Sequence, residues 1–127
     1  MLKISQVVPI LNVSDVAASL RYYTEVLGFE SQWDWGTPPT FGGACSGDFS
    51  VFFCLNAQGE RGTWLSIFVE DVDALYAELV ERGAIIKQPP QNFPWGVREM
   101  NVADPDGHRI RFSSDATGPD DGVIHPG

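Results

Sequence analysis

Apolar and polar residues follow one another along the first half of the chain in a pattern that predicts a strand, a helix and three further strands. The first strand is expected over residues 5–13, where Pro9 restricts it to a sheet edge or to an arm that leaves the sheet. Asp15 offers a helix N-cap, and apolar residues recur at helical spacing until Gly28 ends the helix. The apolar positions of this helix are Val16, Leu20, Tyr23 and Leu27. The three further strands are expected over residues 29–35, 41–46 and 49–55.

The second half of the chain repeats this order of elements at an offset of 56 residues. Asp71 takes the place of the Asp15 cap, and Gly83 falls within one residue of the place of Gly28. The apolar positions of the second helix are Val72, Leu75 and Leu79. Strands are expected over residues 64–69, 84–87, 97–103 and 109–112. Two copies of one βαβββ unit predict an α+β fold, in which two modules form a curved mixed sheet with the helices outside and a ligand cleft.

A change in composition marks the expected end of this domain. Residues 1–113 are predicted to form a single domain, with modules at about 1–57 and 58–113. From residue 114 the sequence is dominated by Ser, Gly, Pro and Asp, which predicts a flexible tail over 114–127. Just before the last strand, residues 104–107 read Asp-Pro-Asp-Gly, with each residue type in the place that a type I turn favours.

The charge of the chain narrows the choice of partners. Eight Lys and Arg residues stand against seventeen Asp and Glu residues, for a formal net charge of -9. Nucleic acids and anionic membrane surfaces require basic proteins, so both are disfavoured, whereas a cationic small molecule would be attracted. No apolar run approaches the roughly 20 residues that span a bilayer, and the start of the chain lacks the pattern of a signal peptide. A cytoplasmic location is therefore expected, with Cys45 and Cys54 as free thiols.

Taken together, these elements resemble the vicinal-oxygen-chelate superfamily, which includes glyoxalase I, extradiol dioxygenases, fosfomycin-resistance enzymes and bleomycin-resistance proteins. Four stretches carry the resemblance: residues 13–23, 27–29, 69–72 and 104–107. Within the superfamily, residues 8–11 and 94–99 are most similar to the signature stretches of the bleomycin-resistance proteins. The segment from Trp33 to Phe41, with its Pro38-Pro39 loop, departs from the pattern of that subgroup.

Enzymes of this superfamily hold a divalent metal with ligands on the first, fourth, fifth and eighth strands, and these positions lack suitable donors here. The first-strand position falls on Val8, the fifth-strand position on Trp64 and the eighth-strand position on Arg111. The fourth strand, residues 49–55, holds no carboxylate or imidazole. Because valine and tryptophan cannot bind a metal ion and arginine repels one, we expect no metal and no cofactor. The sequence also compels no pair of ionisable groups to converge for acid–base chemistry, so we expect no catalytic residue.

Aromatic side chains remain as candidate contacts to a ligand. Trp33 and Trp35 lie two residues apart in a strand and point to the same face. Large aromatic rings beside Pro- and Gly-rich loops offer a stacking surface for a small molecule, and core packing competes with this hypothesis most strongly at Phe53 and Met100. The predicted ligand-binding residues are Trp33, Trp35, Phe41, Phe53, Trp64, Trp95, Met100 and Arg111.

The resemblance implies a metal-free protein that sequesters a hydrophobic, cationic, antibiotic-like ligand such as bleomycin in an aromatic cleft. It also implies a homodimer whose N-terminal arm is exchanged around Pro9. The alternative is an enzyme of the superfamily, a glyoxalase-like lyase or a dioxygenase, with a non-standard metal site. A structural or regulatory dimer without a small ligand is a third hypothesis. The fold by itself does not separate the three, because function depends on the site.

Overall fold

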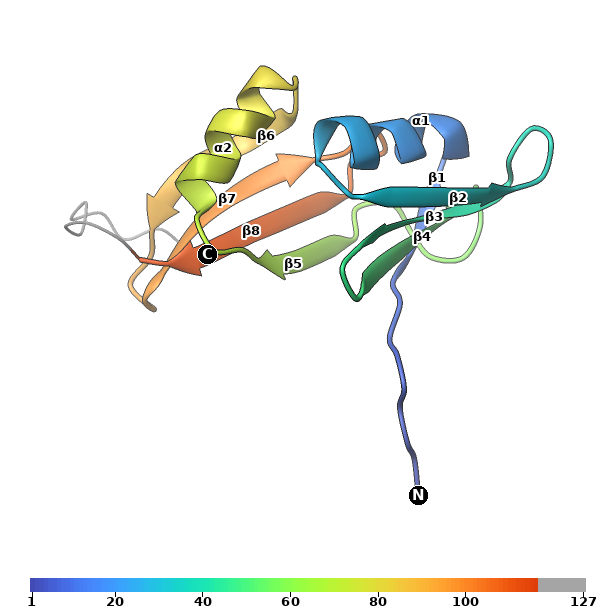
Figure 1. The fold of residues 1–127 in the computed structure, drawn as a ribbon, viewed down its shortest axis with the longest axis horizontal. Helices are drawn as coiled ribbons and strands as arrows, with labels where there is room; N and C mark the ends of the chain where they lie inside the picture. The colour runs from blue at the N-terminus through green and yellow to red at the C-terminus, as the bar shows by residue number, and fades with distance from the viewer. Residues whose placement is uncertain (117–127) are drawn as a thin grey trace. The chain divides into compact units, whose positions relative to one another are not determined.

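The computed structural model describes residues 1–116, which fall into two compact units that divide between Arg61 and Gly62. Each unit packs one helix against a four-stranded mixed sheet (Figure 1). The strand order is β1-β4-β3-β2 in the first sheet and β5-β8-β7-β6 in the second. In each sheet the edge strand β1 or β5 runs parallel to its neighbour, and the other pairs are antiparallel. The predicted α+β class and the duplicated βαβββ module are confirmed.

The first unit begins its regular structure at β1 and contains one helix with a π-helical end. Its elements are β1 (Ile10–Val13), α1 (Val16–Arg21), the π-helical turn η1 (Tyr22–Val26), β2 (Ser31–Trp35), β3 (Phe41–Ser46) and β4 (Phe49–Leu55). The predicted cap is confirmed, because the Asp15 carboxylate accepts a hydrogen bond from the backbone N–H of Ala18 at 3.0 Å. The predicted helical stripe is also confirmed, since all four of its side chains are buried.

The π-helical turn was not predicted by the spacing of apolar residues. In η1 the backbone N–H of Leu27 donates to the carbonyl of Tyr22 at 2.9 Å, a bond over five residues. The following Gly28 has a φ of 91°, which permits the tight helix end that a side chain would strain. This end places the ring of Tyr23 in the core, 4.7 Å from the ring of Phe53 and 5.6 Å from that of Phe29.

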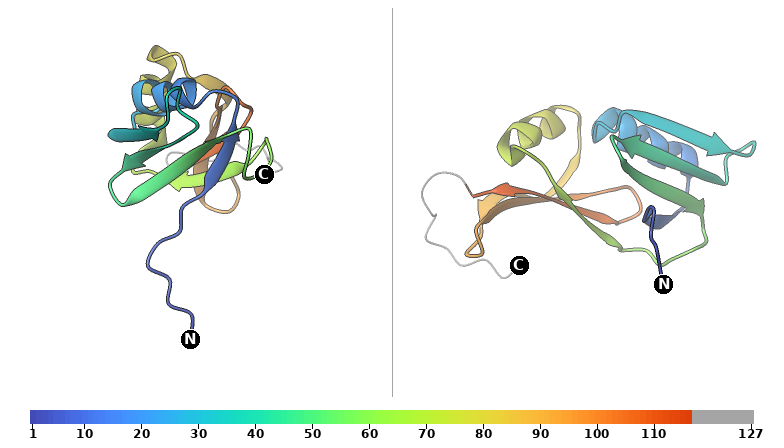
Figure 2. Two further views of the ribbon diagram at one scale, coloured as in Figure 1. Left: turned by 90° about the vertical axis from the view of Figure 1, so that its right-hand side faces the viewer. Right: turned by 60° about the horizontal axis from the view of Figure 1, so that its bottom comes forward.

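The strand β1 is shorter than predicted. It begins at Ile10 instead of residue 5, and residues 1–9 leave the sheet as an extended arm (Figures 1 and 2). Pro9 has no backbone N–H to donate, although its carbonyl still accepts from Phe52 at 2.9 Å. The arm thus leaves at the proline, and β1 itself lies at the edge of its sheet, as Pro9 predicts.

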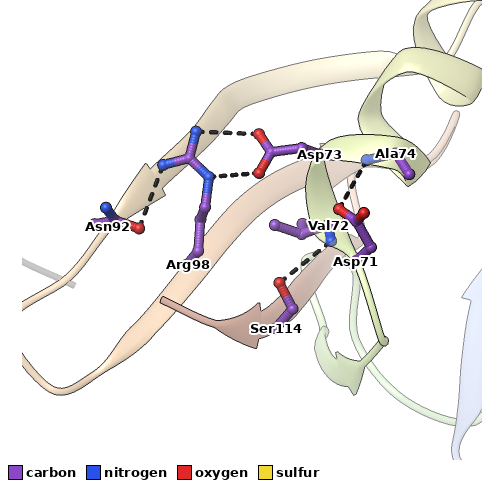
Figure 3. Close-up of polar contacts among 7 residues, drawn as sticks. All are labelled: Asp71, Val72, Asp73, Ala74, Asn92, Arg98 and Ser114. Carbon is purple, nitrogen blue, oxygen red and sulfur yellow. Dashed lines mark hydrogen bonds and ion pairs between the residues drawn. The ribbon is translucent and has the colours of Figure 1, made fainter. Parts of the chain in front are cut away.

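The second unit repeats the arrangement without the π-helical turn. Its elements are β5 (Trp64–Phe68), α2 (Val72–Glu81), β6 (Ile85–Asn92), β7 (Val97–Ala103) and β8 (Arg109–Asp115). The Asp71 cap is confirmed by a hydrogen bond from the backbone N–H of Ala74 at 3.1 Å (Figure 3). Gly83 follows the helix with a φ of 83°, and Val72 and Leu79 are fully buried.

Two strands of this unit are longer than predicted. Two register shifts in the β6–β7 pairing let β6 continue through Pro89 and Pro90 to Asn92. Strand β8 reaches Asp115, so the predicted tail begins too early at residue 114. The Ser114 hydroxyl accepts from the backbone N–H of Val72 at 3.2 Å, which ties the end of β8 to the start of α2 (Figure 3). Residues 117–127 of the predicted tail lie outside the described residues.

An ion pair fixes α2 to its sheet. The guanidinium of Arg98 on β7 donates to both carboxylate oxygens of Asp73 on α2, at 2.7 and 3.0 Å, and to the side-chain carbonyl of Asn92 on β6 at 3.3 Å (Figure 3). Bidentate pairing of this kind orients both side chains. Arg98 therefore points to the helix side of the second sheet.

The turn predicted at residues 104–107 is confirmed and has a structural role. The backbone N–H of Gly107 donates to the carbonyl of Asp104 at 3.1 Å, and the Asp104 carboxylate accepts from the N–H groups of Asp106 and His108 at 2.9 Å. His108 is fully buried, and its Nδ1 accepts from the N–H of Thr63 at 3.0 Å.

Among residues 1–116 no helix combines the length and the apolar character needed to cross a bilayer.

Candidate functional site

Each sheet has one face covered by the helix of its unit and one face without a helix, which we call the helix-free face. Cross-strand partners share a face, so the pairing register assigns every strand residue to one of the two. In the first sheet the pair Phe53–Gly42 lies on the helix side, because a Cβ at Gly42 would meet Val16 and Leu20 of α1. The pair Phe52–Gly43 therefore lies on the helix-free face.

Three rings form an aromatic cluster on the helix-free face of the first sheet. The cluster consists of Trp33, Phe41 and Phe52, whose centroids are 5.4 to 5.5 Å apart in each pair. Such separations and the tilted or edge-on geometry are typical of favourable ring contacts. Trp33 keeps 39% of its surface exposed, and Trp35, the cross-strand partner of Phe41, keeps 70%. The predicted common face of Trp33 and Trp35 is thus confirmed, and the pairing adds Phe41 to it.

Gly43 lets the Trp33 indole lie directly on the sheet. A Cβ at position 43 would stand 2.7 Å from the indole Nε1 and under 3 Å from two of its carbons. Only a glycine leaves room for the ring there, so the cluster rests on the backbone of β3 and is held by its two phenylalanine neighbours. A planar ligand would meet a preformed apolar surface at this place.

Two of the predicted ligand-binding residues lie in the core instead. Phe53 is fully buried against Tyr23, and Met100, the partner of Phe112, is fully buried on the helix side of the second sheet. Phe52, which the sequence reasoning missed, takes the aromatic position on β4. The signal was present, because Val51, Phe53 and Leu55 alternate as a core-facing set and leave Phe52 on the other face.

The helix-free face of the second sheet is polar in its middle part, across β6, β7 and β8. Six side chains of β6, β7 and β8 form a polar grid of two cross-strand rows. The first row consists of Gln88, Asn101 and Arg111, and the second of Gln91, Glu99 and Ser113. The register shifts in β6 bring Gln88 and Gln91 to the same face although they are three residues apart.

The one carboxylate of the grid is buried and its charge is compensated. Glu99 is 3% exposed, and its Oε1 accepts from the indole N–H of Trp95 at 3.3 Å and lies 3.8 Å from Nη1 of Arg111. Trp95 is itself exposed and stacks on Phe93 at 4.9 Å. Two predicted site residues, Trp95 and Arg111, therefore meet at Glu99.

Five of the six grid residues carry a buried polar atom without a hydrogen-bond partner among the described residues. These atoms are Gln88 Nε2, Gln91 Oε1, Asn101 Oδ1, Arg111 Nε and Ser113 Oγ. Buried polar groups are nearly always bonded, and each exception costs about 1–3 kcal/mol. The sixth such atom, Ser19 Oγ, lies in α1. The concentration of unsatisfied atoms on one face marks it as a candidate binding surface.

Trp64, the remaining predicted site residue, lies on β5 beside Arg109. Its indole is exposed, and the Arg109 guanidinium stands 5.5 Å from the ring centroid. This geometry is that of a cation–π contact, in which Arg109 covers one face of the Trp64 ring.

The residues at the metal positions of the superfamily do not fit a divalent metal. Within residues 1–116 no three His, Cys, Asp or Glu side chains converge. Arg111 stands beside the buried Glu99 and would oppose a cation there. Trp64 offers no lone pair to a metal, and the buried His108 is bonded to the backbone of Thr63.

The chain belongs to the glyoxalase/bleomycin resistance protein/dioxygenase superfamily, whose family model matches residues 3–112. The resemblance inferred from the two capped helices and the aspartate turn is thereby confirmed. No curated protein gives a significant match.

Several solved structures share the fold of the chain. An antibiotic-binding protein of Streptomyces sp. is 28% identical with a TM-score of 0.77, and the match covers 91% of this chain and 100% of that one. The bleomycin-binding protein of Streptomyces verticillus, solved with copper(II)-bleomycin, is 27% identical with a TM-score of 0.72 over the same shares. A superfamily member from Sphaerobacter thermophilus is 28% identical with a TM-score of 0.75, over 90% of this chain and 100% of that one.

Proposed function

We propose that this protein is a metal-free binding protein that sequesters a hydrophobic, cationic, antibiotic-like small molecule. The observation that carries the proposal is the aromatic cluster of Trp33, Phe41 and Phe52, with the exposed Trp35 beside it. Exposed indoles on a rigid strand pair supply a large stacking area at little cost in conformational entropy.

Two further observations support the ligand class. The solved relatives include proteins that bind an antibiotic and copper(II)-bleomycin, at 27–28% identity over nine tenths of this chain. The formal charge of -9 attracts a cation from solution. Bleomycin is therefore the first ligand to test.

The test is a fluorescence titration with metal-free and copper-loaded bleomycin, after the metal content of the purified protein has been measured. The proposal predicts saturable quenching of tryptophan emission in protein that contains no stoichiometric metal. Absence of quenching by both forms would remove bleomycin as the ligand. Stoichiometric metal in the protein would favour the alternative, an enzyme of the lyase or dioxygenase type.

We also propose that the protein is a homodimer in which the N-terminal arm is exchanged. The arm leaves the sheet at Pro9 and exposes four apolar side chains: Met1, Leu2, Ile4 and Val7. An extended apolar segment beside an edge strand is suited to pairing with a second copy.

A cytoplasmic location remains part of the proposal. It agrees with two free thiols, of which Cys45 contacts Ser50 at 3.3 Å.

A further inference from the structure

The polar grid has the dimensions of a small planar group. Its rows cross three neighbouring strands, and its two rows are two residues apart along each of β7 and β8. With strands about 4.8 Å apart and a rise of about 3.4 Å per residue, the grid covers roughly 10 by 7 Å. One ring or one pair of amide groups fills such an area.

The charges of the grid are already balanced. Arg111 and Glu99 supply one positive and one negative group, and Glu99 also accepts from the Trp95 indole. A cation bound here would have to compete with Arg111 for the carboxylate, and an anion would face Glu99. Because a buried charge without a partner is costly, the grid disfavours both.

The unsatisfied atoms include both hydrogen-bond donors and hydrogen-bond acceptors. Gln88 Nε2 and Arg111 Nε are donors, whereas Gln91 Oε1 and Asn101 Oδ1 are acceptors. The Ser113 hydroxyl can act either way. An ammonium or amidinium ion offers donors only, and a carboxylate offers acceptors only. A carboxamide offers both.

From this complementarity we propose that the polar grid binds a neutral group that both donates and accepts hydrogen bonds, of which a carboxamide is the simplest. The proposal rests on the proposed function in taking the protein to be a small-molecule binder, and it names the chemistry of the bound group. The unsatisfied atoms then find partners in the complex, and the Glu99–Arg111 pair stays intact.

The test compares four probes that share one phenyl ring: benzamide, benzamidinium, benzoate and toluene. Nitrogen-15 NMR of the full chain follows the side-chain amide signals of Gln88, Gln91 and Asn101 and the indole N–H of Trp95. Benzamide is expected to shift these amide signals saturably and at lower concentration than the other three probes. Binding of any of the other three probes at the same or a lower concentration, or unchanged amide signals with all four probes, would overturn the proposal.

Matched variants test whether benzamide binds at the grid. Gln91→Met and Asn101→Leu each remove one polar group and are expected to weaken benzamide binding about fivefold to tenfold. Gln32→Met is the control, because Gln32 lies on the helix side of the other sheet, where its side chain contacts the Thr24 hydroxyl. Equal benzamide affinity in the wild type and both grid variants would overturn the proposal.

The bleomycin and benzamide titrations together distinguish failure of the grid proposal from failure of the proposed function. If bleomycin quenches the tryptophans while benzamide leaves the three amide signals unchanged, the protein binds small molecules and the inference about the grid is wrong. If neither compound produces a change, the inference about the grid is wrong and bleomycin is removed as the ligand of the proposed function.

Discussion

At the scale of single residues, Gly43 determines whether the aromatic cluster can form. The Trp33 indole occupies the space that a side chain at position 43 would need, with 2.7 Å between its Nε1 and the place of a Cβ. Gly43→Ala is therefore expected to displace the indole and to reduce ligand-induced quenching of tryptophan fluorescence. In a Trp33→Leu background the same substitution should have little further effect, because the ring it displaces is absent. Additive effects of the two substitutions would contradict this account of the cluster.

Two neighbouring residues of β6, Gln91 and Asn92, lead to stability predictions of opposite sign. Gln91 Oε1 is buried without a partner, so Gln91→Met should raise the free energy of unfolding by about 1 kcal/mol. The side chain of Asn92, the next residue, accepts a hydrogen bond from Arg98, so Asn92→Leu should lower the free energy of unfolding by a similar amount. Urea unfolding measures both. A loss of stability in Gln91→Met would show that its amide is satisfied in the folded protein.

At the scale of secondary-structure elements, the helices are the part that the sequence predicts best. A capping aspartate, an apolar stripe and a closing glycine act locally, so Asp15, Asp71 and Gly83 can be recognised without knowledge of the fold. The π-helical turn after Arg21 could not be recognised, because the apolar positions at Tyr23 and Leu27 fit an α-helix equally well.

The caps lead to a prediction for each helix. Asp71→Ala removes the acceptor for the Ala74 N–H and should lower the free energy of unfolding by about 1 kcal/mol. Asp15→Ala should act in the same way on α1 through Ala18. Asp→Asn at either position keeps a side-chain acceptor and should restore most of the loss. Chemical denaturation followed by circular dichroism measures these changes, and no loss in the alanine variants would argue against the caps.

Strand faces were harder to predict than helices. Trp33 and Trp35 could be assigned to one face because they lie two residues apart in one strand, whereas the place of Phe41 opposite Trp35 depends on the register of the hairpin. The polar grid depends on two register shifts in β6, which no local pattern of Gln88 or Gln91 reveals. A site of this kind becomes visible only when the cross-strand pairs are known.

At the scale of the whole molecule, residues 1–8 of the arm belong to neither sheet of a single chain. The proposed exchange predicts that a variant lacking residues 1–8 is monomeric, whereas the full chain is dimeric at micromolar concentration. Light scattering coupled to size-exclusion chromatography measures both masses. A monomeric full chain, or a truncated chain that remains dimeric, would contradict the exchange.

Ligand binding without a metal can be measured by calorimetric titration of the chelator-treated protein with metal-free bleomycin. We predict saturable binding to the wild type and at least about tenfold weaker binding to Trp33→Leu, since the indole supplies part of the stacking surface. Binding that appears only after a divalent metal is restored would contradict the claim, and so would equal affinity of the two proteins.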